Sequence, residues 1–173
     1  MVSATSATAA ADEAMPHAGR MGLFPVDPAC TFCGIVSGRV RASRVYEDVQ
    51  VLSFMDIHPA APGDLLVIPK AHAAALEDID QTLTAHLFQV VHLLVRGLRR
   101  SGLPCEGVNL FLADGEAADQ TVLHLHVHVF PRTTDDRFRL QVRWLERSRA
   151  DLDDDAAHIR AGLARSGHRP RSP

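Results

Sequence analysis

Three histidines alternate with apolar residues in the segment His124-Leu125-His126-Val127-His128-Val129. Successive side chains of a strand point to opposite faces, so the three imidazoles would line one face, about 6.5–7 Å apart. A histidine changes its charge near neutral pH, and a ring nitrogen can attack phosphorus or bind a metal ion. The pattern therefore makes these imidazoles candidates for nucleophilic catalysis, in which neighbouring rings orient the reactive one and transfer protons.

The spacing alone leaves other interpretations of this face open. The three rings could form a partly exposed face without a function. They could also bind a metal ion, although alternate side chains of one strand run nearly parallel, so only adjacent pairs would converge. Nucleophilic catalysis is favoured because strict alternation of three histidines is improbable by chance.

A second candidate is the pair Cys30 and Cys33, which forms a C-x-x-C motif. Such a pair can bind zinc or carry out redox chemistry. No strand–helix–strand pattern follows it, which argues against a thioredoxin-like role. The third cysteine, Cys105, makes the count odd, and this does not indicate a disulfide framework.

Hydrophobic periodicity predicts the elements that must position these residues. Alternating or continuous apolar runs predict strands, and a recurrence every three or four residues predicts helices. A tight hairpin at 47–48 joins the first two strands, the run at 65–68 is a buried central strand, and Asp151 could cap the last helix. The predicted strands are 45–46, 49–54, 65–68, 108–112 and 121–131, and the helices are 73–100, in one or two pieces, and 151–163.

This order predicts an α+β fold, with an antiparallel sheet of about five strands, one long helix and a C-terminal helix. We expect a disordered tail at 1–22, one domain at 23–145, and a C-terminal helix and disordered tail at 146–173. Hydrophobic residues make up 46% of the 173 residues and charged residues 23%, as in ordinary globular chains.

Composition also excludes some classes of protein. The net charge of −3 argues against a nucleic-acid binder held by a basic excess. No apolar run is long enough for a transmembrane helix. The first 19 residues contain no Lys or Arg and no strong apolar stretch, so we expect no secretory signal and a cytoplasmic protein.

Several short motifs precede the triad in a fixed order. They are Cys30-x-x-Cys33-x-Ile35-Val36-x-Gly38, Val45-Tyr46-Glu47-Asp48, Phe54-Met55-Asp56-Ile57-x-Pro59, Pro62-Gly63 and Leu66-Val67-Ile68-Pro69-Lys70-x-His72, followed by the run from Asp114 to Val122. With the triad, they resemble the histidine-triad (HIT) family, in its bacterial type with an N-terminal C-x-x-C. The resemblance covers about residues 30–132.

The resemblance implies a chemistry. HIT proteins hydrolyse or transfer nucleotides at the α-phosphate of nucleoside phosphoramidates, dinucleoside polyphosphates or related adenylates. It places the nucleophile at His126, which would form a nucleotidyl-histidine intermediate that water then hydrolyses. His124 and His128 would orient His126 and bind phosphate oxygens.

The resemblance also implies how a purine nucleotide would bind. Gln120 and Thr121 would contact the phosphate and the bridging atom, and Asp56 would contact the ribose. Phe54 and Ile57 would line the base pocket, although both could be core residues, and Asp56 could only shape a turn. The resemblance further implies a homodimer whose sheets join.

Some bacterial members of the family bind zinc, and the matching ligand set here is Cys30, Cys33, His72 and His124. Two thiolates and two imidazoles suit a tetrahedral structural site. The alternative is a pair of reduced cysteines with a surface histidine at 72.

Three residues depart from the family pattern. Ala113 stands where many relatives have Asn or Gln, Asp119 where Gly is common, and Asp64 replaces a histidine after Pro-Gly. If the two aspartates face an anionic substrate, we expect them to weaken its binding. Two other functions therefore stay open: a nucleotide-binding, zinc-stabilised interaction protein with little catalysis, and a purely structural metalloprotein.

Overall fold

A computed structural model describes residues 25–167 of the chain. These residues form two units, one ending at Phe138 and one beginning at Arg139, and each is considered by itself. The tail predicted to be disordered at 1–22 lies outside the described range, as does most of the C-terminal tail predicted at 165–173, of which only 165–167 are described.

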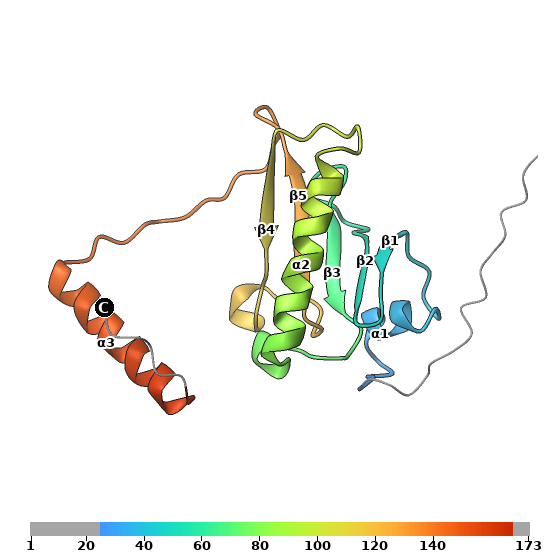
Figure 1. Cartoon of the computed structure of the whole chain (residues 1–173). Helices are drawn as coiled ribbons and strands as arrows, with labels where there is room; N and C mark the ends of the chain where they lie inside the picture. Colours follow the sequence, from blue (N-terminus) through green and yellow to red (C-terminus); the bar gives the residue numbers. More distant parts are fainter. Residues whose placement is uncertain (1–24, 168–173) are drawn as a thin grey trace, which may run out of the picture. The chain divides into compact units, whose positions relative to one another are not determined.

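The first unit is built on one antiparallel sheet of five strands (Figure 1). The spatial order is β1-β2-β3-β5-β4, and every neighbouring pair is antiparallel. This confirms the predicted α+β class. The strands are β1 (Arg44–Glu47), β2 (Val51–Met55), β3 (Leu65–Pro69), β4 (Gly107–Phe111) and β5 (Val127–Arg132).

A hairpin joins β1 and β2, as the sequence predicts, but its turn is longer than expected. The Asp48 carboxylate accepts hydrogen bonds from the backbone N–H groups of Gln50 and Val51, each at 2.8 Å. Aspartate commonly shapes turns in this way. The predicted strand 49–54 is therefore displaced, and pairing begins at Val51.

The long helix of the first unit is α2 (Gln81–Leu98). Its N-cap is Asp80, whose carboxylate accepts from the N–H of Leu83 at 2.8 Å. The helix predicted over 73–100 is shorter than expected because a 3₁₀ turn, η1 (Leu76–Asp78), precedes the cap. Figure 1 shows α2 running along the sheet.

Alternation along the strands divides the core between the two faces of the sheet. On one face, strand residues such as Val67 and Val127 pack with the apolar side of α2. On the other face, residues such as Leu66 pack with Phe32 of the short helix α1 (Thr31–Val36). Leu125, Val127 and Val129 all belong to the α2 face, as the alternation predicts.

The predicted strand 121–131 is too long, and β5 begins only at Val127. Of the three histidines, only His128 lies in the sheet, where it pairs with Leu66. Beyond the Val67–Val127 pair the chain leaves the ladder, and the N–H of Leu125 donates to the carbonyl of Ala73 at 2.7 Å. Apolar alternation continues through this bend, which explains why the sequence pattern does not reveal the break.

The second unit contains α3 (Arg149–Arg165). The hydroxyl of Ser148 accepts from the N–H of Asp151 at 3.1 Å, and the Asp151 carboxylate accepts from the N–H of Ser148 at 3.2 Å. The reciprocal pair is a capping box, so the cap is Ser148 and not Asp151 as predicted. No described helix is both long enough and apolar enough to cross a membrane.

Candidate functional site

The central histidine, His126, is held by its own backbone. Its Nδ1 lies 2.7 Å from the carbonyl oxygen of His124. A carbonyl can only accept, so Nδ1 carries the proton and donates it, which leaves the lone pair on Nε2. The residue is only 5% exposed, so its surroundings and this hydrogen bond together hold the ring in one orientation.

Two rings fix the orientation of the His126 ring from its sides. The Phe32 ring meets it edge to face, with ring centroids 5.4 Å apart, and the His128 ring lies 5.3 Å away. Phe32 also lies 5.8 Å from the ring of His124. The sequence pattern gives no sign of this contact, because the six-residue α1 is too short for periodicity to reveal.

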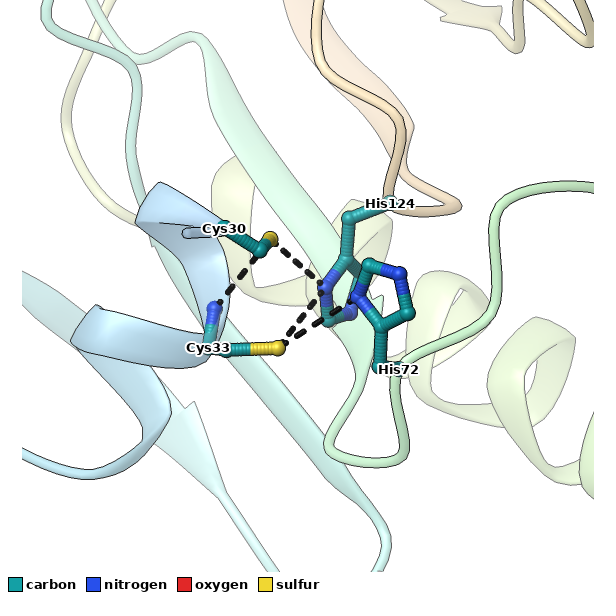
Figure 2. A group of neighbouring side chains, drawn as sticks. All are labelled: Cys30, Cys33, His72 and His124. Atoms are coloured by element: carbon teal, nitrogen blue, oxygen red, sulfur yellow. Dashed lines mark hydrogen bonds between the residues drawn. The ribbon is translucent and has the colours of Figure 1, made fainter. Parts of the chain in front are cut away.

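His124 belongs to a different group of side chains. Its Nδ1 lies 3.4 Å from Sγ of Cys30 and 3.7 Å from Sγ of Cys33. Nδ1 of His72 lies 3.4 Å from Sγ of Cys33. Figure 2 shows the two imidazoles turned toward the two sulfurs, so the four residues predicted as zinc ligands are brought together.

The spacing of these four side chains fits a tetrahedral zinc site. With Zn–S at about 2.3 Å and Zn–N at about 2.0 Å, adjacent sulfur and nitrogen ligands lie about 3.5 Å apart. The Nε2–H of His124 donates to the carbonyl of Pro69 at 2.9 Å, which leaves Nδ1 as the free ligand atom. The donor set and its supporting hydrogen bond therefore suit a metal ion.

The cluster also connects distant parts of the chain. Cys30 is the N-cap of α1, and its sulfur accepts from the N–H of Cys33 at 3.5 Å. The N–H of His72 donates to the carbonyl of Pro25 at 2.9 Å. A metal ion here would tie the N-terminal arm to the segment that precedes β5.

Burial sets the electrostatics of these groups. It lowers the pKa of His124 to about 4, an effect that the hydrogen bond to Pro69 opposes and that His72 and His126 reinforce. Burial also lowers the pKa of His126, against the hydrogen bond to the His124 carbonyl. Both rings are therefore neutral at pH 7. Burial raises the pKa of the Cys33 thiol, which a bound metal ion would reverse.

The third histidine, His128, faces two carboxylates. Its Nδ1 lies 3.6 Å from an oxygen of Asp56 and 3.6 Å from an oxygen of Asp64. Asp64 is 1% exposed, so its charge is buried beside His128 and does not extend into solvent. This arrangement depends on the aspartate at position 64, where the family pattern has a histidine.

The predicted phosphate-binding residues lie in the turn before the triad. The Gln120 amide oxygen accepts from the N–H of Gly115 at 2.8 Å, and its nitrogen donates to the carbonyl of Ala74 at 2.7 Å. Gln120 is buried and holds the turn in place, while Thr121 is exposed. Asp119, the C-cap of η2 (Glu116–Ala118), has φ of 64°, a conformation that glycine and aspartate tolerate better than most residues.

The predicted base-pocket residues occupy different environments. Phe54 is 3% exposed and packs edge to face on Phe32 with ring centroids 5.4 Å apart, so it is part of the core. Ile57 is 83% exposed, on the loop after β2. Ala113 is 4% exposed.

The family model of the HIT domain matches residues 37–135, more than half of the chain. The chain belongs to the HIT family. The match includes the three histidines of the triad, whereas Cys30 and Cys33 lie before it.

Curated HIT relatives cover the same region. An uncharacterized HIT-like protein of Mycobacterium tuberculosis is 33% identical over 135 residues, which are 78% of this chain and 93% of the relative. Adenosine 5′-monophosphoramidase of Candida albicans is 34% identical over 67% of this chain and 78% of its own. Adenylylsulfatase of Arabidopsis thaliana is 30% identical over 75% of this chain and 65% of its own.

Solved structures of HIT proteins share the fold. A protein from Streptococcus mutans superposes with a TM-score of 0.76 at 33% identity, covering 91% of this chain and 99% of its own. A Zn-bound histidine triad family protein from Mycobacterium smegmatis is 39% identical, with a TM-score of 0.62, covering 80% of this chain and 96% of its own.

Proposed function

We propose that this HIT protein hydrolyses or transfers nucleotides at the α-phosphate through a covalent intermediate on His126. The observation that carries the proposal is the bond from His126 Nδ1–H to the carbonyl of His124. It fixes the tautomer with the lone pair on Nε2, and burial keeps the ring neutral at pH 7. A neutral, oriented imidazole is the form that attacks phosphorus.

The proposed reaction has two steps. In the first, a bond forms between Nε2 of His126 and the α-phosphorus, while the bond from phosphorus to the leaving group breaks and the leaving group takes a proton from solvent. In the second, a water oxygen attacks phosphorus and gives up a proton to solvent, the N–P bond breaks, and a nucleoside monophosphate and neutral His126 are released. Most of the catalytic effect comes from positioning and charge neutralisation.

We assign the remaining roles as the family resemblance implies. His128 binds phosphate oxygens beside His126, and the exposed Thr121 contacts the phosphate and bridging atom, while Gln120 holds the turn that presents Thr121. Asp56 contacts the ribose. Ile57 lines the base pocket, and Phe54 supports this pocket from within the core. The orienting role of His124 belongs to its carbonyl oxygen, since its ring faces the cysteines.

The named relatives support an adenine nucleotide as substrate. One is called a monophosphoramidase of adenosine and another an adenylylsulfatase. The two names share an adenylyl group and differ in what is bonded to it. We infer a purine nucleoside phosphoramidate or a dinucleoside polyphosphate, because both present the same α-phosphate.

Adenosine 5′-phosphoramidate labelled at the phosphorus tests the proposal. Wild-type protein should release AMP, and a labelled protein species that is stable in alkali and labile in acid, as an N–P bond is, should be trapped in the first turnover. His126→Ala should lose both, whereas His92→Ala, an exposed histidine of α2, should keep both. Turnover by His126→Ala at the wild-type rate would refute the proposed nucleophile. Nucleotide binding without turnover by wild-type protein would favour the interaction protein.

We also propose that Cys30, Cys33, His72 and His124 bind one structural zinc ion. Support comes from the sulfur–nitrogen spacing, the hydrogen bond that frees His124 Nδ1, and the Zn-bound relative. The zinc would fix the N-terminal arm and would take no part in the chemical steps.

Metal analysis checks this site. Wild-type protein should contain about one zinc per chain, and Cys33→Ser should contain little. Cys105→Ser is the matched control, because Cys105 lies outside the cluster and should leave the zinc content unchanged. Equal zinc in wild type and Cys33→Ser would contradict the assignment.

The family resemblance further leads us to propose a homodimer in which two sheets join. In the first unit β4 is a terminal strand of the sheet, and Leu110 and Phe111 on it are 48% and 46% exposed. Sedimentation equilibrium should give twice the chain mass. A monomer at micromolar concentration would contradict the proposal.

A further inference from the structure

Asp56, Asp64 and His128 form a second group of converging ligand atoms, separate from the cysteine cluster. One oxygen of each carboxylate and Nδ1 of His128 all lie within 4.8 Å of one another. The two oxygens come from the ends of the loop between β2 and β3, and the nitrogen comes from β5. The two ends of one loop and one strand therefore bring a ligand atom each to the group.

The loop holds each carboxylate by one oxygen and leaves the other free. One oxygen of Asp56 accepts from the N–H of His58 at 2.8 Å, and one oxygen of Asp64 accepts from the N–H of Ala60 at 2.9 Å. The N–H of Asp56 also donates to the carbonyl of Asp64 at 3.1 Å. These bonds orient the remaining oxygens, as supporting hydrogen bonds orient metal ligands.

The second oxygen of Asp64 is buried without a hydrogen-bond partner among the described residues. The Asp64 side chain is 2% exposed, and this oxygen lies 3.6 Å from Nδ1 of His128. A direct N–H···O hydrogen bond would bring the two atoms to about 2.7–3.2 Å. A buried carboxylate oxygen left unpaired is costly, so it needs a partner that the described side chains do not provide.

The separations fit an ion between the three atoms better than direct contact. Ligands about 2.2 Å from one ion lie about 3.1 Å apart at octahedral angles and about 3.6 Å apart at tetrahedral angles. Both nitrogen–oxygen distances in the group are 3.6 Å. The cysteine cluster has the same kind of spacing, at 3.4–3.7 Å.

We propose that Asp56, Asp64 and His128 bind a divalent cation of the Mn²⁺ class, which tolerates wider ligand angles than Mg²⁺. Two carboxylate oxygens and one imidazole nitrogen suit such an ion better than a thiolate-preferring one. The His128 side chain is 25% exposed, so solvent reaches the group and completes the coordination shell. The ion gives the orphaned oxygen of Asp64 its partner.

The site also explains how acidic residues can stand beside an anionic substrate. Two carboxylates here would repel a phosphate, whereas a bound divalent cation reverses the local charge and attracts phosphate oxygens. The ring of His128 lies 5.3 Å from that of His126. This consequence rests on the proposed function, but binding of the cation does not.

The test is a titration of zinc-saturated, nucleotide-free protein with Mn²⁺. Electron paramagnetic resonance measures how much Mn²⁺ is bound. Wild-type protein should bind one Mn²⁺, and Asp64→Asn should weaken binding at least about tenfold. Asn keeps the shape and can still accept from Ala60, so the loop bond is preserved. Asp135→Asn, the same change at an exposed position in the first unit, should bind as wild type does.

A second measurement uses wild-type protein and needs no variant to fold. Substoichiometric Mn²⁺ should broaden the imidazole NMR signals of His128 before those of His86, which lies on α2. Equal Mn²⁺ affinity in wild type and Asp64→Asn, equal broadening of the two histidines, or no binding at millimolar Mn²⁺ would each overturn the site. Because no substrate is present, these results are independent of whether His126 is the nucleophile.

Discussion

At the scale of the residue, the most informative group is His126. Burial lowers its pKa below the ordinary histidine value, although the hydrogen bond to the His124 carbonyl acts in the opposite sense. The neutral ring therefore persists at a pH where an exposed histidine would be half protonated. A nucleophile needs this form, so the same burial that stabilises the fold also keeps the ring reactive.

The first prediction concerns the titration of His126. NMR should give it a pKa below the ordinary histidine value of 6.5. The first-turnover rate should then stay nearly constant as pH falls through 6.5, and should decline only at lower pH. A His126 titration centred above 6.5 would contradict the description of the site.

The sequence predicts the types of the site residues better than their surroundings. The four zinc ligands come together as the family resemblance implies, although they belong to three segments that are distant in the sequence. The sequence leaves open whether Asp64 faces an anionic substrate. Its direction toward His128 depends on loop hydrogen bonds and on the pairing of β3 with β5, which no local pattern encodes.

At the scale of the element, hydrophobic periodicity predicts which segments form helices and strands, whereas contacts between distant segments decide where a strand begins and ends. The three- and four-residue recurrence correctly predicts α2, and the all-apolar run correctly predicts the central β3. Residues 123–129 alternate, yet β3 continues to Pro69 beyond its last pair with β5, which joins Val67 to Val127. The bend before Val127 goes with a tertiary contact, the bond from the N–H of Leu125 to the carbonyl of Ala73, which periodicity does not encode. The helix α1 is too short to give a period.

The second prediction concerns the α2 face of the core. Leu87 is fully buried against the sheet, whereas Leu93 on the same helix is 50% exposed. Leu87→Ala removes buried apolar surface and leaves a cavity, so it should lower the free energy of unfolding by about 2–5 kcal/mol. Leu93→Ala should lower it by less than about 1 kcal/mol. Urea unfolding measures both, and similar losses would show that the assigned helix face is wrong.

At the scale of the whole molecule, the metal cluster and the sheet are coupled through His124. The residue is completely buried, and its ring touches both the cysteines and the carbonyl that ends β3. Without metal, the folded chain must keep this ring neutral below the pH at which an unfolded chain protonates it. Protonation of His124 therefore favours the unfolded chain.

The third prediction is that the metal-free protein, prepared by chelation, loses stability as pH falls from 6.5 to 4. The folded pKa of His124 is about 4 and the ordinary value is 6.5, so the unfolded state binds the extra proton in this window. The loss attributable to His124 should be on the order of 3 kcal/mol, and His126 adds to it in the same direction.

Urea unfolding at several pH values between 7.5 and 4.5 measures this dependence. His124→Gln should flatten the slope, and His92→Gln should preserve it, because only the first removes a buried titrating ring. Zinc-loaded protein should hold its stability to lower pH until protons displace the metal from the cluster, and then lose it over a narrow range. A metal-free stability that is constant or rises toward pH 4.5 would show that His124 is not held neutral by the fold.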